Sequence, residues 1–170
     1  MKIILAVSVF VAALSGCVMT PAAPITNVQK VYEMPALTQA QIYDASRQWF
    51  AESFKSANAV IQYEDKVSGA IIGKGNMKFP CVGVFQCIAY MTATVDFTIR
   101  VDTKDNKMRV TYNDLTIKRP ASYNSGIFQS ASENPIYLQS EKDSITAKLD
   151  VLTDEMAEKI KSGQNYNSNW

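Results

Sequence analysis

The feature that most constrains the fold of this 170-residue chain is a strict two-residue alternation between residues 91 and 102. Apolar and polar side chains alternate there without a break, in the order Met-Thr-Ala-Thr-Val-Asp-Phe-Thr-Ile-Arg-Val-Asp. Successive side chains of a β-strand point to opposite faces of the sheet, so the pattern predicts one face on a core and one face in water. This arrangement is typical of an antiparallel sheet that is covered on one side only.

The rest of the chain predicts the partners of this strand. Apolar residues at helical spacing predict helices at 38–55 and 140–161, and Thr38 and Gln41 have the spacing of a capping box. Turn residues at 103–106 predict a hairpin, residues 119–135 have the composition of a loop, and further strands are predicted at 30–34, 59–63, 69–77 and 107–118. We therefore predict an α+β domain with an antiparallel sheet of about five strands and two helices on one face, in the order β-α-β-β-β-β-α.

The N-terminus has the pattern of a secretory signal. Lys2 is followed by an apolar run over residues 3–14, which is too short for a membrane span of roughly 20 residues. The next residues complete Leu14-Ser15-Gly16-Cys17, which resembles the lipobox of bacterial lipoproteins. The resemblance implies cleavage after Gly16, diacylglyceryl transfer to the Cys17 thiol, and acylation of the new amino terminus, typically by palmitate. The alternative is an ordinary signal peptide in which Cys17 is incidental.

These patterns divide the chain into a signal peptide at 1–16, a lipidated N-terminus and tether at 17–28, one domain at 29–162, and a polar tail at 163–170. Pro21 and Pro24 favour an extended tether. We expect a domain held by its anchor at the periplasmic side of a membrane. By resemblance to the sorting rule of enteric bacteria, Val18 after the cysteine favours the outer membrane.

The composition argues against several classes of function. Removing residues 1–16 takes away Lys2 and no acidic residue, which leaves 16 basic and 16 acidic residues out of the original 17 and 16. This balance gives no electrostatic reason to bind nucleic acid. The chain has no histidine, so the usual general base and the commonest metal ligand are missing. We expect no cofactor and no metal, and we expect a protein that is not an enzyme.

Cys81 and Cys87 are the two cysteines that follow Cys17, and in an oxidising periplasm they predict a disulfide across a loop. A redox-active pair is the alternative, although the spacing is not Cys-x-x-Cys. The loop also carries Val84 and Phe85. These apolar residues either fold over the edge of the core or form a tip that docks on a partner or on lipid.

The polar side chains of the alternating strand form the second candidate surface. The binding residues proposed on it are Thr94, Asp96, Thr98, Arg100 and Arg109. Such a face is either simply solvated, with its charges paired across strands, or a concave site for a polar ligand. An acid/base pair of Asp96 with Asp102 or Asp114 is conceivable, but no feature of the sequence raises a carboxyl pKa there.

Several stretches together are similar to a known family. They are residues 49–56, 59–66, 69–75, 97–102 and 107–110. The pattern resembles an uncharacterised family of bacterial envelope proteins, a domain of unknown function described as having a TATA-binding-protein-like (TBP-like) fold, over roughly residues 30–118. The resemblance implies the predicted sheet and helices and no particular function. DNA binding is not implied, because the sheet lacks the basic face with apolar wedges that minor-groove binding requires.

These observations favour a non-enzymatic, membrane-anchored lipoprotein. We expect its domain to bind an envelope protein through the polar sheet face or the disulfide loop. The alternative is a module that binds a small ligand or a peptidoglycan fragment on the sheet face, and a carboxylate-based hydrolase is a third possibility.

Overall fold

The computed structural model describes residues 23–53, 60–124 and 126–163. The predicted signal peptide, the lipidation site Cys17, the first half of the tether (residues 17–22) and most of the polar tail lie outside the described residues, so their assignments stay predictions. Asn27 and Val28, predicted as the end of the tether, already belong to the first strand. The elements in chain order are β1 (Asn27–Glu33), α1 (Gln39–Ser53), β2 (Val60–Asp65), β3 (Ala70–Lys78), α2 (Val84–Ala89), β4 (Thr94–Lys104), β5 (Lys107–Arg119), β6 (Ser122–Asn124), β7 (Ile127–Gln129), β8 (Ser132–Pro135) and α3 (Gln139–Ser162).

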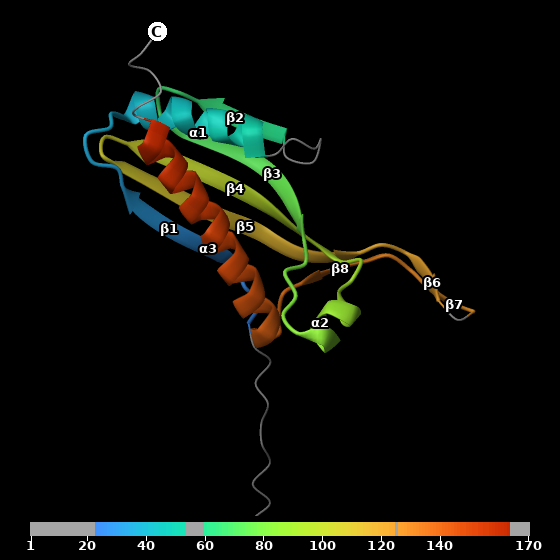
Figure 1. The fold of residues 1–170 in the computed structure, drawn as a ribbon. Coiled ribbons are helices and arrows are strands. Elements are labelled where there is room, and N and C mark those ends of the chain that lie inside the picture. Colours follow the sequence, from blue (N-terminus) through green and yellow to red (C-terminus); the bar gives the residue numbers. More distant parts are fainter. Residues whose placement is uncertain (1–22, 54–59, 125, 164–170) are drawn as a thin grey trace, which may run out of the picture.

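Residues 94–102 of the alternating segment lie in β4, the central strand of an antiparallel sheet. The prediction is wrong at the start of the segment, because residues 91–93 precede the strand and Met91, predicted on the core face, is 78% exposed. The sheet has the order β1-β5-β4-β3-β2, and β8 pairs with the far end of β5. Along β4 the side chains alternate between buried and half-buried as far as Thr103, as the two-residue period predicts. Helices α1 and α3 cover one face of the sheet, and the other face is open (Figure 1). The predicted α+β class and the placement of both helices are confirmed.

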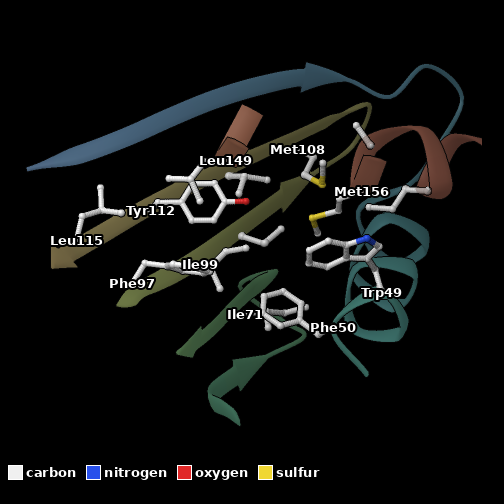
Figure 2. Close-up of a cluster of buried hydrophobic side chains, with 14 of the residues drawn as sticks. Trp49, Phe50, Ile71, Phe97, Ile99, Met108, Tyr112, Leu115, Leu149 and Met156 are labelled. Atoms are coloured by element: carbon white, nitrogen blue, oxygen red, sulfur yellow. The ribbon is translucent and has the colours of Figure 1, made fainter. Parts of the chain in front are cut away.

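The core lies between the sheet and the two long helices. Phe97 and Ile99 of β4 meet Tyr112 of β5, and α1 and α3 contribute Trp49 and Leu149 (Figure 2). The Tyr112 hydroxyl is paired with the Thr153 hydroxyl at 3.0 Å, which satisfies its hydrogen bonding inside the core. Burying one such large side chain contributes about 1.5–3 kcal/mol, so this layer supplies much of the drive for folding.

The ends of the predicted elements are held by local hydrogen bonds. The predicted capping box opens α1, because Thr38 Oγ1 accepts from the Gln41 amide at 3.3 Å and Gln41 Oε1 accepts from the Thr38 amide at 2.9 Å. The predicted hairpin between β4 and β5 turns at Asp105 and Asn106. Asn106 takes the left-handed conformation with φ of 60°, which asparagine tolerates better than most residues.

Two segments predicted as loops contain regular structure. The disulfide segment includes α2, and residues 119–135 contain the β6–β7 hairpin and β8, so the main sheet has six strands rather than five. Both segments lack the hydrophobic periodicity from which helices and strands are predicted. α2 has only six residues and no buried side chain, and β7 and β8 are exposed along their whole length. Short exposed elements of this kind show no hydrophobic period.

Candidate functional site

The open face of the sheet carries the predicted polar side chains. Thr94, Asp96, Thr98 and Arg100 project from β4 and are half-buried, as the alternation predicts. Arg109 of β5 lies opposite Asp102 of β4, one row beyond Arg100. The proposed residues on the two strands therefore share one surface, which we call the outer sheet face.

Asp102 is the centre of the strongest charge cluster on the outer sheet face. Its two carboxylate oxygens accept from Arg100 Nη2 at 2.7 Å and from Arg109 Nη2 at 2.8 Å. Partial burial raises the pKa of Asp102, but the hydrogen bonds from Arg100 and Arg109 outweigh burial, and the pKa is lower than its usual value. A carboxyl group that acts as a general acid needs a raised pKa, so Asp102 is poorly suited to that role.

The other carboxylates of the outer sheet face are also engaged. Lys118 Nζ lies 2.7 Å from Asp96 Oδ2 and 3.6 Å from Glu133 Oε2, and Thr98 Oγ1 donates to Asp114 Oδ2 at 2.8 Å. Asp96, Asp102 and Asp114 each have a partner of their own, and no bond between two of them is present among the described contacts. Exposed pairs of this kind contribute about 0–1 kcal/mol each, so they mainly neutralise the surface.

A shallow groove opens at the end of this face, where β8 joins β5. It has a volume of about 510 Å³ and is largely open to solvent. Its lining includes Thr92, Thr94, Lys118, Arg119 and Glu133. The groove can hold a small polar group, but Lys118, a cation of its lining, is already paired with Asp96.

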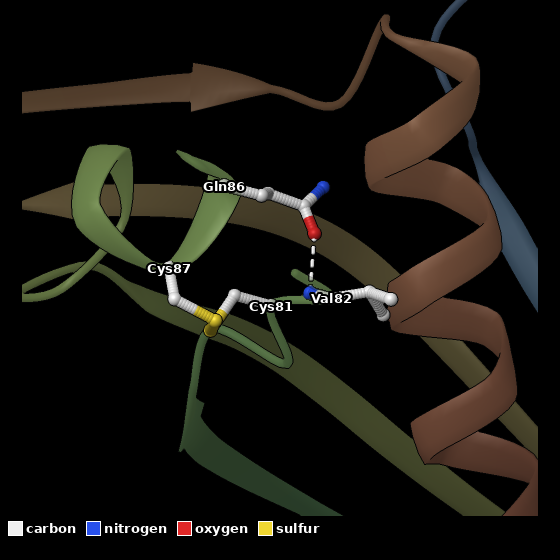
Figure 3. Close-up of a disulfide and its surroundings, with 4 residues drawn as sticks. All are labelled: Cys81, Val82, Gln86 and Cys87. Atoms are coloured by element: carbon white, nitrogen blue, oxygen red, sulfur yellow. Dashed lines mark hydrogen bonds between the residues drawn. A yellow bond between two sulfur atoms is a disulfide. The ribbon is translucent and has the colours of Figure 1, made fainter. Parts of the chain in front are cut away.

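The second candidate surface is built on the predicted disulfide, which is present in the structure. Cys81 and Cys87 are bonded with their Cα atoms 4.9 Å apart, so the chain between them is closed into a short loop (Figure 3). Gln86 Oε1 accepts from the Val82 amide at 2.6 Å and braces the same loop. Gly83, with φ of 76°, lets the chain turn directly into α2.

The side chains of this loop point into solvent rather than over the core. Val84 is 72% exposed and Phe85 is 90% exposed, and Val82, Ile88 and Met91 are exposed as well. Of the two alternatives for the loop, the structure has the exposed tip. Several large apolar side chains that are mostly exposed on one short segment are typical of contact sites, whereas isolated ones are common on any protein surface.

The base of the loop, in contrast, is firmly attached to the domain. Phe79 is buried and stacks on Tyr90 with ring centroids 4.0 Å apart. The Arg119 guanidinium lies 4.6 Å from the Tyr90 ring, and the Tyr90 hydroxyl donates to Glu141 at the start of α3. Tyr90 thus joins the disulfide segment to the end of β5 and to α3, which gives the exposed tip a fixed position.

The β6–β7 hairpin adds apolar side chains that were not predicted as functional. Tyr123 and Phe128 are directly opposed across the hairpin, and both are exposed, as is Ile127. We call the exposed apolar side chains of residues 82–91 and of this hairpin the apolar end, and its members are Val82, Val84, Phe85, Ile88, Met91, Tyr123, Ile127 and Phe128.

A sequence signal for the apolar end does exist. No charged residue occurs between Lys78 and Asp96, and none occurs between Arg119 and Glu133, in a chain that is 19% charged. Charged side chains normally cover exposed segments. Two uncharged stretches that carry exposed apolar side chains therefore indicate a surface suited to contact with another molecule.

The described chain begins close to the apolar end. The Ala23 carbonyl accepts from Lys142 Nζ at 2.6 Å, and the Ile25 amide donates to the Ile136 carbonyl at 3.0 Å. Lys142 is next to Glu141, which binds Tyr90 at the base of the disulfide segment. The first described residues, the start of α3 and α2 therefore lie at the same end of the domain, as Figure 1 also shows.

The described ranges offer no site for a metal ion formed by three or more acidic or cysteine side chains. Within the same ranges, the longest helix, α3, is too polar to cross a bilayer, and the other helices do not meet the requirement either.

Comparison with known proteins places the fold. A search of curated proteins gives no match. Two crystal structures are similar to this chain. One is a DUF4468 family protein from Bacteroides ovatus, with 14% identity, a TM-score of 0.61 and coverage of 84% of this chain and 91% of its own. The other is a TBP-like protein from Parabacteroides distasonis, with 13% identity, a TM-score of 0.59 and coverage of 82% and 92%.

At these identities the two structures establish the fold alone, in agreement with the TBP-like fold that the sequence resemblance implies. A family model matches residues 29–118, which run from β1 to the end of β5 and include α2. The chain therefore belongs to the family described as domain of unknown function (DUF4468) with TBP-like fold.

Proposed function

We propose that this protein is a lipid-anchored, non-enzymatic binding module of the bacterial cell envelope, and that the apolar end is its contact surface. The observation that carries the proposal is the exposure of Phe85, Val84 and Phe128 in two segments without charge. Leaving such side chains in water costs roughly 1.5–3 kcal/mol each compared with burying them, so a partner that covers them gains that free energy.

The anchor is proposed from the lipobox at Leu14-Ser15-Gly16-Cys17. Acyl chains on Cys17 would contribute about 0.8 kcal/mol for each buried CH₂, and several chains together give durable attachment where one does not. Attachment at Cys17 would place the domain on the periplasmic side of a membrane, and Val18 favours the outer membrane.

The chemistry of the outer sheet face supports binding over catalysis. The chain has no histidine, and Asp102 has a lowered pKa and two arginine partners. Asp96 and Asp114 are each engaged by a neighbour. A hydrolase that uses two carboxylates needs one of them protonated near neutral pH, and the pKa of Asp102 is shifted in the opposite direction.

Mass spectrometry of the mature protein tests the anchor. We expect the N-terminal peptide to begin at Cys17 and to carry acyl chains, and we expect the Cys17→Ser variant to leave the membrane fraction. An unmodified Cys17 in a protein that still fractionates with membranes would refute the anchor. For the contact surface, Val84→Ser with Phe85→Ser should abolish association, and Asp96→Ala with Arg100→Ala should preserve it.

The groove at the end of β5 supports a second candidate, a small anionic ligand such as a peptidoglycan fragment. Lys118 and Arg119 lie at its wall and could bind a carboxylate. Such a ligand must compete with Asp96 and Glu133 for Lys118, and this competition ranks the candidate below the apolar end. Titration with muropeptides, with Lys118→Ala as the control, separates the two.

A further inference from the structure

We propose that the occupant of the apolar end is the surface of the bilayer that holds the Cys17 anchor. The inference rests on the proposed function, since it takes the lipid anchor as given, and it names the partner of that contact surface. In this arrangement the side chains of Val84, Phe85 and Ile88 from α2, and of Tyr123, Ile127 and Phe128 from the hairpin, enter the boundary between headgroups and acyl chains.

The first argument is the length of chain between the anchor and the domain. Five residues separate Cys17 from Ala23, and a fully extended chain from one to the other reaches at most about 20 Å. Ala23 is bound to Lys142, whose neighbour Glu141 binds Tyr90 directly after α2. The tether therefore leaves the domain at the end that carries the exposed apolar side chains, and it is too short to let that end move far from the bilayer.

The second argument is the chemistry of the surface. Both segments lack charged residues, and their exposed side chains are aliphatic or aromatic. Phe85 and Phe128 are apolar side chains of the kind that interfacial segments bury in a bilayer, and Tyr123 can place its ring among the chains while its hydroxyl stays among polar groups. Within the described residues, segments of this character occur at the end of the domain where the tether begins.

The third argument is that the position is rigid. The disulfide, the Gln86–Val82 hydrogen bond and the Tyr90 contacts fix α2 on the domain before any partner arrives. A preformed tip loses little conformational freedom on docking. A short tether also keeps the local concentration of the tip at the membrane high, so the inserted state is populated even if insertion is weak.

The ionisable residues that border the two segments carry both signs. Lys78 and Arg119 precede the segments, and Asp96 and Glu133 follow them. Lys118 is close to both acidic residues, at 2.7 and 3.6 Å. Docking through buried apolar area, rather than through anionic headgroups, should therefore be nearly insensitive to salt and to the fraction of anionic lipid.

The test uses the full protein purified from membranes in its lipidated form. It is reconstituted into vesicles of phosphatidylethanolamine and phosphatidylglycerol, with or without bromine on the acyl chains, which quenches indole fluorescence at close range. Phe85→Trp reports on the apolar end, and Val67→Trp is the matched control. Val67 is 92% exposed, similar to Phe85 at 90%, and it lies in the β2–β3 turn, at the opposite end of β3 from α2.

Wild-type emission provides the background of Trp49 and Trp170. We expect the added indole of Phe85→Trp to lose most of its emission in brominated vesicles, equally at low and high salt, while Val67→Trp changes no more than wild type. Both sites are exposed, so neither variant should disturb folding, and a matching thermal unfolding curve verifies this. Phe128→Trp supplies a second probe at the apolar end.

Two failures are distinguishable. Acylated protein that stays on the vesicles, with Phe85→Trp and Phe128→Trp both unquenched, overturns bilayer docking and leaves the anchor intact; crosslinking of position 85 to an envelope protein would then name the occupant. An N-terminal peptide without acyl chains overturns the anchor and the docking inference with it.

Discussion

The outer sheet face and the apolar end are both exposed, but charged side chains are paired with one another on the first and apolar side chains face solvent on the second. On the outer sheet face the charged groups find partners within the same surface, as Asp102 does with Arg100 and Arg109. At the apolar end, Phe85 and Val84 point into solvent from a rigid base. The charges of the first surface are paired without a ligand, and under the proposed function the second surface is covered by a partner.

This difference indicates where to look for function in a fold whose family has none assigned. A polar sheet with alternating residues attracts attention as a ligand site, but its charges balance internally. A disulfide and a stacked tyrosine fix a loop whose exposed tip adds nothing to the core. This arrangement is explained if the exposed tip is itself a contact surface. Four variants test this contrast, ordered by their expected effect on stability.

Removal of the disulfide should have the largest effect. With Cys81→Ser and Cys87→Ser together, loss of a loop of this length should lower the free energy of unfolding by about 2 kcal/mol in the chain-entropy model. Chemical denaturation of wild type and of the double variant measures the difference. An unchanged free energy would mean that the tip is held by the Tyr90 contacts alone.

Asp102→Asn tests the outer sheet face. It removes a carboxylate that is only 18% exposed and leaves Arg100 and Arg109 without their shared partner, so we expect a loss of about 1–2 kcal/mol at neutral pH. The folded-state pKa of Asp102 is lowered from 3.8, so its stabilisation is fully present above pH 3.8 and disappears as the pH falls through the lower folded value.

The difference between wild type and Asp102→Asn should therefore be constant from neutral pH down to about pH 4 and shrink below it. Urea denaturation at a series of pH values measures it. Glu33→Gln, which changes an exposed carboxylate paired with Lys107 at 3.3 Å, is the control and should have little effect.

Tyr90→Phe tests the base of the apolar end. The ring keeps its stack on Phe79, but Glu141, which is buried, loses the hydroxyl that donates to it. A buried acceptor that loses its donor costs about 1 kcal/mol or more. We expect that loss in thermal or chemical unfolding, together with a weaker hold on α2 that is visible as faster amide exchange over residues 84–89.

Val84→Ser with Phe85→Ser should have the smallest effect on stability. Both side chains are exposed and contribute little to the core, so the free energy of unfolding should change by no more than about 0.5 kcal/mol. Association with the partner surface should nevertheless be lost. A large destabilisation would show that these residues pack on the domain and would remove the contrast between the two surfaces.

Sequence periodicity was sufficient for most of the fold. The sheet and both long helices could be predicted because each has a local pattern in the sequence. These patterns are the alternation in β4, the capping box at Thr38 and the stripe of apolar residues in α3. α2 and β8 could not, because they have few residues and are held by tertiary contacts and strand pairing rather than by a local pattern.

The candidate site was predicted in part. The spacing of Cys81 and Cys87 predicted the disulfide, and the outer sheet face followed from the alternation. Whether Phe85 covers the core or faces water depends on the space left between α3 and the sheet, which the sequence does not contain. The hairpin residues Tyr123 and Phe128 were missed because their segment was assigned to a loop, although its lack of charge was visible.

The most direct test of the account replaces Phe85 or Arg100 with a photo-crosslinking amino acid in the full-length protein and irradiates living cells. The apolar end and the outer sheet face are then compared in the same anchored molecule. The account predicts efficient adducts from position 85, to lipid above all, and few from position 100. Adducts from position 100 with none from position 85 would contradict it and return the outer sheet face to first place.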